Sequence, residues 1–322
     1  MTIVVTGANG FLGRAVVPRL AAAGYGVRGL VRQLDPATAA RAQFLPVGDL
    51  THLPDRAMLN ALRGATAVVH LAALAHRPLD GGPESASALR RINVDVSGRL
   101  ARAALLSGAT HFVFASSVKV NGETSPPGRP LSESDPPNPE DDYAESKWAA
   151  ECTLAVVAEQ SDLRVTALRL PLTYGAGAKA NFAALVRAVR RGLPLPLGGI
   201  ANRRSVLGAG NLCSALQTLL ESSDASAHGR VTPYFVADAQ PVSTAELVRA
   251  IARALRRPPR LFAIAPSLLR LGGAWCGRSE AVERLLDTLE VDTAAFRTRF
   301  GWSPPESLDQ GLAAAIGDTP PL

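Results

Sequence analysis

A tyrosine and a lysine four residues apart form the pair in this sequence best suited to acid–base chemistry. Tyr143-Ala-Glu-Ser-Lys147 lies in a helical pattern, so the phenol and the ammonium share one helix face. A free phenol, with a pKa of about 10, is a poor acid or base at neutral pH. We expect the neighbouring ammonium to favour the phenolate and lower that pKa toward the working range. A surface Tyr–Lys pair without function fits the same spacing.

Two serines follow an apolar run over residues 111–115 that reads as a strand. Ser116 and Ser117 would therefore stand at the carboxyl end of that strand, the edge where ligands of parallel α/β sheets bind. A hydroxyl there could hold a substrate carbonyl. A serine-rich strand exit with no role in binding is the alternative.

A glycine-rich turn lies at the N-terminus, between a predicted strand and a predicted helix. In Gly7-Ala-Asn-Gly10-Phe-Leu-Gly13 the first glycine permits a tight turn, the second lets the backbone approach a diphosphate, and the third lets the helix pack closely on the sheet. The free N–H groups at the helix N-terminus favour phosphate. This context predicts a dinucleotide site.

The elements that must position these residues alternate between strand and helix. Apolar runs predict strands over residues 3–6, 27–31, 44–47, 67–71, 111–115 and 165–170, with helices over 11–23, 86–106 and 143–160 between them. This alternation predicts a doubly wound parallel α/β sheet of the Rossmann type over residues 1–171. For residues 172–322 we expect a smaller C-terminal α/β lobe that binds the substrate. Its predicted helices span 181–191, 211–221 and 244–255, and a strand near 234–236 joins the edge of the main sheet.

The amino-acid composition limits the kinds of ligand and partner that we expect. The 322 residues carry 34 Lys and Arg against 28 Asp and Glu, a net charge of +6 that favours an anionic ligand. Aromatic residues make up 5% and do not alternate with basic runs, which argues against nucleic acid. Three distant cysteines and scattered histidines predict neither a disulfide framework nor a metal site. No signal peptide or spanning segment is recognisable, which predicts a cytoplasmic protein without stable membrane insertion.

Several motifs together resemble a known family. The glycine turn, His70-Leu-Ala-Ala73, Ser116-Ser117, Tyr143 with Lys147, Arg169-Leu-Pro171 and Phe300-Gly-Trp302 resemble the extended short-chain dehydrogenases/reductases, more narrowly their nucleotide-sugar epimerase/dehydratase/reductase group. The resemblance covers nearly the whole chain. It implies that Ser117 orients the substrate, Tyr143 is the acid–base, and Lys147 assists it and holds the nicotinamide ribose. The implied cofactor-binding residues are Gly7, Asn9, Gly10, Phe11, Leu12, Gly13, Asp49, Leu50, Leu71, Ala72, Ala73, Ser116, Tyr143, Lys147 and Pro171.

Differences from the group's sequence pattern limit which of the group's reactions we expect. Val118-Lys119 replaces the acidic pair that the similar 4,6-dehydratases carry, which argues against dehydration. The segment from Ser116 to Glu123 looks most like bacterial surface-polysaccharide enzymes. It predicts NAD(P)H-dependent reduction of the 4-keto group of a UDP-linked 6-deoxy-4-keto-N-acetylhexosamine. The alternatives are a UDP-sugar 4-epimerase that retains NAD and a catalytically silent NAD(P)-binding module. Substrate contacts are expected from Ser117, Lys119, Asn181, Arg203 and Arg204, whereas Leu172 stands where the group has asparagine.

Cofactor choice and assembly complete the expectations. The second predicted strand has no carboxylate at its end to accept from a ribose 2′-OH, and Arg32 follows it directly. An arginine could pair with a 2′-phosphate, so we expect a preference for NADP(H), with Asp49 serving the adenine. Arg32 stacked on adenine, or facing solvent, would give dual specificity.

The helices over 86–106 and 143–160 resemble those of a four-helix homodimer interface. Solvated outer faces are the alternative.

Overall fold

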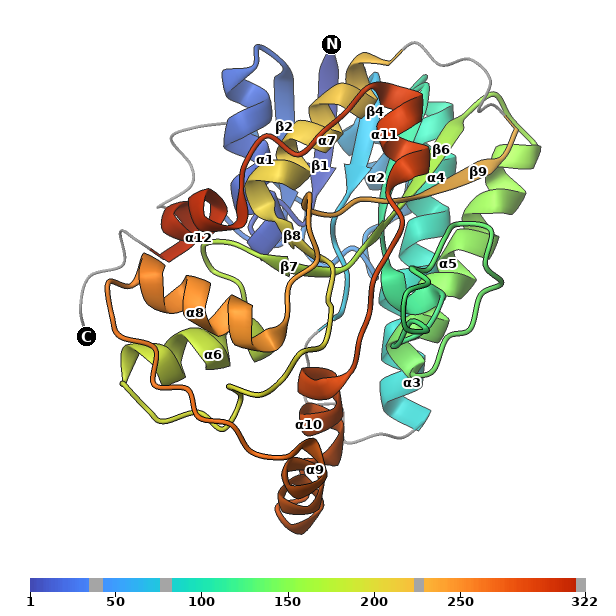
Figure 1. Cartoon of the computed structure of the whole chain (residues 1–322). Helices are drawn as coiled ribbons and strands as arrows, with labels where there is room; N and C mark the ends of the chain where they lie inside the picture. Colours follow the sequence, from blue (N-terminus) through green and yellow to red (C-terminus); the bar gives the residue numbers. More distant parts are fainter. Residues whose placement is uncertain (35–42, 76–82, 223–228, 317–322) are drawn as a thin grey trace.

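The computed structural model describes residues 1–34, 43–75, 83–222 and 229–316 (Figure 1). They form a seven-stranded sheet in the order β3-β2-β1-β4-β5-β6-β9, and every pairing is parallel. The strands are β1 (Thr2–Thr6), β2 (Gly26–Val31), β3 (Gln43–Pro46), β4 (Ala67–His70), β5 (His111–Ser117), β6 (Arg164–Leu170) and β9 (Val231–Phe235). The predicted doubly wound α/β fold is confirmed. The strand order changes direction between β1 and β4, where such sheets bind ligands.

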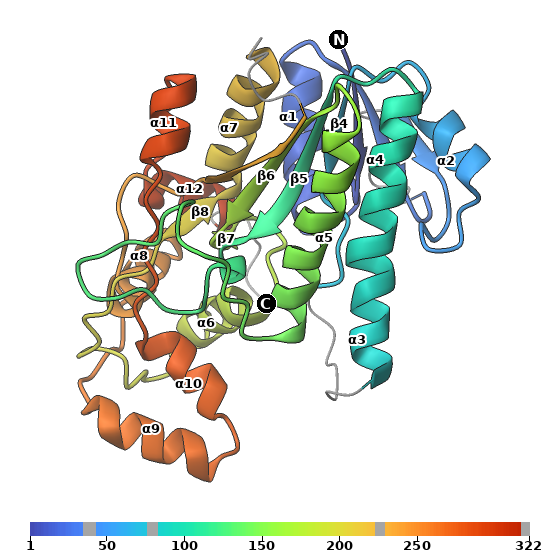
Figure 2. The same ribbon diagram turned by 90° about the vertical axis from the view of Figure 1, so that its right-hand side faces the viewer.

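Helices cover both faces of this sheet (Figure 2). One core packs the sheet against α1 (Phe11–Ala22), α7 (Ala209–Glu221) and α11 (Ala294–Phe300). The other packs it against α2 (Asp55–Leu62), α4 (Val96–Leu106) and α5 (Asp142–Glu159). Burial on both faces explains why these strands read as continuous apolar runs.

A smaller lobe with its own core lies beyond the carboxyl end of the sheet. Two short parallel strands, β7 (Leu172–Tyr174) and β8 (Val206–Gly208), pack with α6 (Ala180–Arg190), α8 (Thr244–Ala254) and α12 (Leu308–Ile316). Ser243 and Glu246 form the expected capping box at the start of α8. A hairpin of α9 (Pro266–Trp275) and α10 (Ser279–Leu286) projects from this lobe (Figures 1 and 2). The second half of the chain thus builds the lobe and also returns α7 and β9 to the main sheet.

The helix expected over residues 86–106 is interrupted. It consists of α3 (Pro83–Leu89), a π-helical segment η1 (Arg90–Asp95), and then α4. The π segment buries Asn93, whose side chain accepts from Leu74 N at 2.8 Å and donates to Ser146 Oγ at 2.9 Å. These bonds join the segment after β4 to α5, so the irregular turn lies beside the functional edge, as π-bulges often do.

Candidate active site

The glycine turn lies against the segment that follows β4. Gly7 has a φ of 66°, and a Cβ there would lie 2.8 Å from Ala72 N. A Cβ on Gly13 would collide with the backbone of Gly7 and Ala8. Gly7 therefore allows the close approach of the turn to residues 71–73, and Gly13 the close packing of α1. This cradle, open at the helix N-terminus, fits a dinucleotide diphosphate.

Side chains fix the turn from the side of β2. Asn9 Nδ2 donates to Gln33 O at 3.0 Å, and Arg14 Nε donates to Asn9 O at 2.9 Å. Phe11 opens α1 and lies beside Gly175 of the smaller lobe. The predicted cofactor residues of the turn, together with Leu71, Ala72 and Ala73, thus gather at the switch point between β1 and β4.

Arg32 and Asp49 form an ion pair where β2 and β3 end. Their Nη2 and Oδ2 atoms are 3.5 Å apart, and the Arg32 side chain is 71% exposed. Both residues follow strands that pair in parallel, β2 and β3, so their strand ends meet. Hydrogen bonds from the backbone N–H and the hydroxyl of Thr51 lower the pKa of Asp49. A carboxylate therefore stands beside Arg32, although β2 itself ends without one. Leu50 follows, with its carbonyl accepting from Arg99 Nη1.

Ser117, Tyr143 and Lys147 come together at the carboxyl end of β5. The strand runs two residues further than predicted, so Ser116 and Ser117 are its last residues. Tyr143 lies in the first turn of α5, and Ser117 acts on its hydroxyl by favouring the charged form of the phenol. Lys147 is buried, donates from Nζ to Ala115 O at 2.7 Å, and lies 5.9 Å from the centroid of the Tyr143 ring.

The expectation that the pKa of Tyr143 is lowered toward the working range is wrong. Burial, with a smaller contribution from the charge of Asp141, raises the pKa of Tyr143 to about 12. Burial also lowers the pKa of Lys147 to about 7. Helical spacing gives the proximity of the two groups but not their desolvation, which disfavours both charged forms. The phenol is therefore protonated at neutral pH; it is a weaker acid than a free phenol but still able to protonate an alkoxide, whose conjugate acid has a much higher pKa.

A buried polar network lies behind the catalytic strand. Ser116 Oγ donates to Glu151 Oε1 at 2.5 Å, and Arg169 donates to Glu151 Oε2 at 2.6 Å and to Asn121 Oδ1 at 2.9 Å. Ser116 therefore directs its hydroxyl away from Ser117, and the structure does not bring that hydroxyl to the crevice. Sequence reasoning missed Glu151. The signal was Arg169 within a buried strand, because a buried guanidinium requires a carboxylate partner.

His70 is a buried residue at the end of β4. Its Nδ1 is 2.6 Å from Thr6 Oγ1 and its Nε2 is 2.9 Å from Ser97 Oγ. Burial and the nearby Lys147 lower its pKa to about 3, which keeps the imidazole neutral. Thr6 also accepts from Ala72 N, so His70 supports the cofactor edge indirectly.

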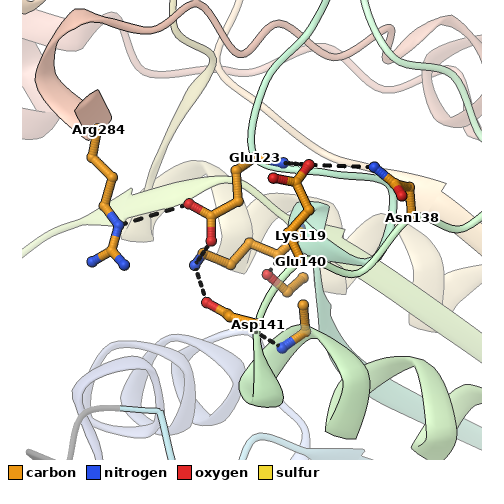
Figure 3. Close-up of polar contacts among 8 residues, drawn as sticks. Lys119, Glu123, Asn138, Glu140, Asp141 and Arg284 are labelled. Carbon is orange, nitrogen blue, oxygen red and sulfur yellow. Dashed lines mark hydrogen bonds and ion pairs between the residues drawn. The ribbon is translucent and has the colours of Figure 1, made fainter. Parts of the chain in front are cut away.

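The predicted substrate residues come from three segments of the chain, and Lys119 and Arg204 both lie near Glu123. Lys119 donates to Glu123 and to Asp141 (Figure 3). Asn181 is exposed in the first turn of α6, and Arg203 pairs with Glu290 at 2.9 Å. Arg204 donates to Asp287 O at 2.9 Å and lies within electrostatic range of Glu123. Pro171 links β6 to β7. Their contacts with a sugar nucleotide stay predictions.

Two further observations apply to residues 1–34, 43–75, 83–222 and 229–316. Within these ranges no helix is both long and apolar enough to cross a bilayer. Nor do three or more histidine, cysteine, aspartate or glutamate side chains gather there closely enough to hold a metal ion.

The fold and the site define a class: a Rossmann protein of the extended short-chain dehydrogenase/reductase type, with a glycine turn and a Ser–Tyr–Lys set. A model of the NAD dependent epimerase/dehydratase family matches residues 3–234. The chain belongs to this family.

Individual proteins are similar along almost the whole chain. A UDP-glucose 4-epimerase from Vibrio cholerae is 36% identical over 313 residues, covering 97% of this chain and 93% of the relative. A 2-alkyl-3-oxoalkanoate reductase from Stenotrophomonas maltophilia is 27% identical and covers 97% of each chain. Among solved structures, MoeE5 in complex with UDP-glucose and NAD has a TM-score of 0.76 and 26% identity, covering 98% of this chain and 97% of that one.

Proposed function

We propose that this protein reduces the 4-keto group of a UDP-linked 6-deoxy-4-keto-N-acetylhexosamine. The observation that carries the proposal is the half-buried Tyr143 phenol, which is protonated at neutral pH and lies with Ser117 and Lys147 at the carboxyl end of β5. A site that begins its cycle with a phenolic proton is suited to protonating an oxygen that becomes an alkoxide.

Each residue has a definite part in this reaction. A bound reduced nicotinamide supplies the hydride. Ser117 holds the carbonyl oxygen, and Tyr143 gives its proton to that oxygen as negative charge develops there. Lys147 holds the ribose, and its ammonium form stabilises the phenolate that remains. We assign Asn181, in the first turn of α6, and Arg203 and Arg204, just before β8, to the diphosphate and the nucleoside.

Cofactor choice belongs to the same proposal. Family membership makes the protein NAD-dependent in the general sense, and we propose that NADP(H) is preferred. The exposed guanidinium of Arg32 at the end of β2 supports this preference, because it can pair with a 2′-phosphate. Asp49 then orients Arg32 and contacts the adenine.

A UDP-sugar 4-epimerase is the second candidate, favoured by the likeness to the Vibrio cholerae protein along 97% of the chain. An epimerase uses the same catalytic residues but regenerates its cofactor in every turnover, whereas a reductase consumes one cofactor per product. The third alternative, a silent binding module, would turn over no sugar nucleotide.

The experiment compares the two reactions on one preparation. Purified protein is incubated with the 4-keto sugar nucleotide and NADPH or NADH, and separately with UDP-glucose and UDP-N-acetylglucosamine without added cofactor. We expect stoichiometric loss of reduced-nicotinamide absorbance with the keto sugar, and reduced product by NMR. Interconversion of the two C4 epimers by protein that keeps its cofactor through dialysis would establish the epimerase instead. Turnover in neither assay would favour the binding module.

A further inference from the structure

We propose that Lys119 and Asp141 are positioning residues, whose ion pair joins the strand end that carries Ser117 to the helix start that carries Tyr143. The proposal deepens the proposed function, on which its kinetic readout rests. Neither residue needs to touch the substrate for this role, since both act through Tyr143 and Ser117.

The contacts lead from Ser117 to the first turn of α5, and Figure 3 shows the part between Lys119 and Asp141. Lys119 lies in η2 (Val118–Val120), and its backbone N–H donates to Ser117 Oγ at 3.2 Å. Its Nζ donates to Asp141 Oδ2 at 2.5 Å. The other oxygen of Asp141 accepts from Ala144 N at 2.7 Å and so caps α5, one residue before the helix begins. One carboxylate therefore fixes the first turn, with Tyr143, relative to Ser117.

The pair is shielded enough for its charges to matter. The Lys119 and Asp141 side chains are 25% and 34% exposed. Lys119 also bonds Glu123, and Glu123 Oε2 lies 3.7 Å from Arg284 Nε on α10. Charges thus alternate from the smaller lobe to α5, and Lys119 is the cation between the two carboxylates. Its removal would leave the Asp141 carboxylate, whose charge acts on the catalytic phenol, without its cation.

The charged groups that face Tyr143 determine whether a substitution at Asp141 or Lys119 raises or lowers its pKa. Asp141 lies at the start of its own helix, Lys147 lies one turn along, and Ser117 faces it from β5. The negative charge of Asp141 disfavours the phenolate, and the positive charge of Lys119 offsets it. Asp141→Asn should therefore make the Tyr143 phenol more acidic, whereas Lys119→Met should make it less acidic. If the ion pair only held the fold together, both substitutions would shift the Tyr143 pKa in the same direction, because both remove the same ion pair.

The test follows the titration of Tyr143 directly in the full chain, with no substrate present. Ring-fluorinated tyrosine, whose phenol is more acidic, is incorporated, and its ¹⁹F resonances are followed against pH. Tyr143→Phe identifies the signal among the four tyrosines. We expect the titration midpoint of Tyr143 to fall in Asp141→Asn and to rise in Lys119→Met, each by about one pH unit. This is the size of the effect of a unit charge within roughly 10 Å at an effective dielectric constant of about 20. Lys119→Arg should restore the wild-type value.

Glu140→Gln is the matched control. It removes a carboxylate one residue before Asp141, but Glu140 is exposed and bonds Asn138 and Glu123 N rather than Lys119. We expect it to leave the Tyr143 titration unchanged. Shifts in the same direction for Lys119→Met and Asp141→Asn, or no shift in either, would overturn the proposal. Inactivity of the wild-type protein on every sugar would refute the proposed function and leave this titration intact.

Kinetics on the keto sugar separate positioning from direct contact. Lys119→Met should lower kcat at least tenfold with little change in KM for the sugar nucleotide. A raised KM with an unmoved Tyr143 titration would make Lys119 a substrate contact and overturn the positioning role.

Discussion

At the scale of single residues, Tyr143 is the group on which the chemistry depends. Tyr143→Phe keeps the ring and removes only the hydroxyl, so the cofactor crevice should stay intact. We expect turnover of the keto sugar to fall roughly 10²–10⁴-fold, the contribution typical of a positioned acid, while NADPH affinity changes little. Stopped-flow absorbance and a fluorescence titration measure the two quantities. Near-normal turnover would remove Tyr143 from the mechanism.

Arg32 carries the second prediction at this scale. Arg32→Ala removes the guanidinium proposed to pair with the 2′-phosphate and leaves the Asp49 carboxylate without its cation. We expect kcat/KM for NADPH to fall while that for NADH holds, so that the preference moves toward NADH. Asp49→Asn is the control, because it removes the carboxylate and keeps Arg32. Wild-type preference for NADH, or an unchanged ratio in Arg32→Ala, would contradict the assignment.

At the scale of elements, the buried pair between α5 and β6 holds the catalytic helix to the sheet. The Glu151 and Arg169 side chains are 3% and 4% exposed. Glu151→Ala leaves a buried guanidinium without its carboxylate, and we expect unfolding free energy to fall by about 3–5 kcal/mol. Urea denaturation measures the change. The exposed pair of Arg253 and Asp309 is the matched control, and Arg253→Met should cost less than about 1 kcal/mol. Equal losses would refute this reading of burial.

The sequence predicted the main elements well, because each carries a local signal. Gly7, Gly10 and Gly13 mark the first turn, and the capping box marks α8. The elements it missed lack such signals. β7 and β8 have three residues each, too short for a pattern. α9, which Pro266 opens as its first residue, was also not among the predicted helices. The π turn at Asn93 depends on backbone hydrogen-bond register, which side-chain periodicity does not record.

In the site, too, the features with a local sequence signal were predictable, and those that depend on the folded chain were not. Ser117, Tyr143 and Lys147 were recognisable from their spacing and their place at strand and helix ends. The bond between Lys119 and Asp141 joins residues 22 apart through a loop without periodicity, and only the folded chain brings them together. The raised pKa of Tyr143 likewise follows from burial, a property of the whole molecule.

At the scale of the whole molecule, buried histidines make stability depend on pH. Burial lowers the pKa of His111 to about 3, against an ordinary value of 6.5. The unfolded chain therefore binds a proton that the folded chain does not, and this stability is lost as pH falls from about 6.5 toward 3. His111→Gln should reduce the slope of unfolding free energy against pH by about 1.4 kcal/mol per pH unit in that window. Urea titrations at several pH values measure it, and parallel slopes would contradict the account.

Assembly is the last property of the whole molecule, and the outer faces of α4 and α5 bear on it. Leu106 and Val156 on these helices are 75% and 50% exposed, which supports the proposed homodimer through this face. Val156→Asp should convert a dimer to a monomer in light scattering at micromolar concentration, because a charge would be buried at the interface. Trp275, 90% exposed on α9, provides the control, since Trp275→Ser removes an apolar group of the projecting hairpin instead. Dissociation by Trp275→Ser alone would place the interface on that hairpin, and a monomeric wild-type protein would end the proposal.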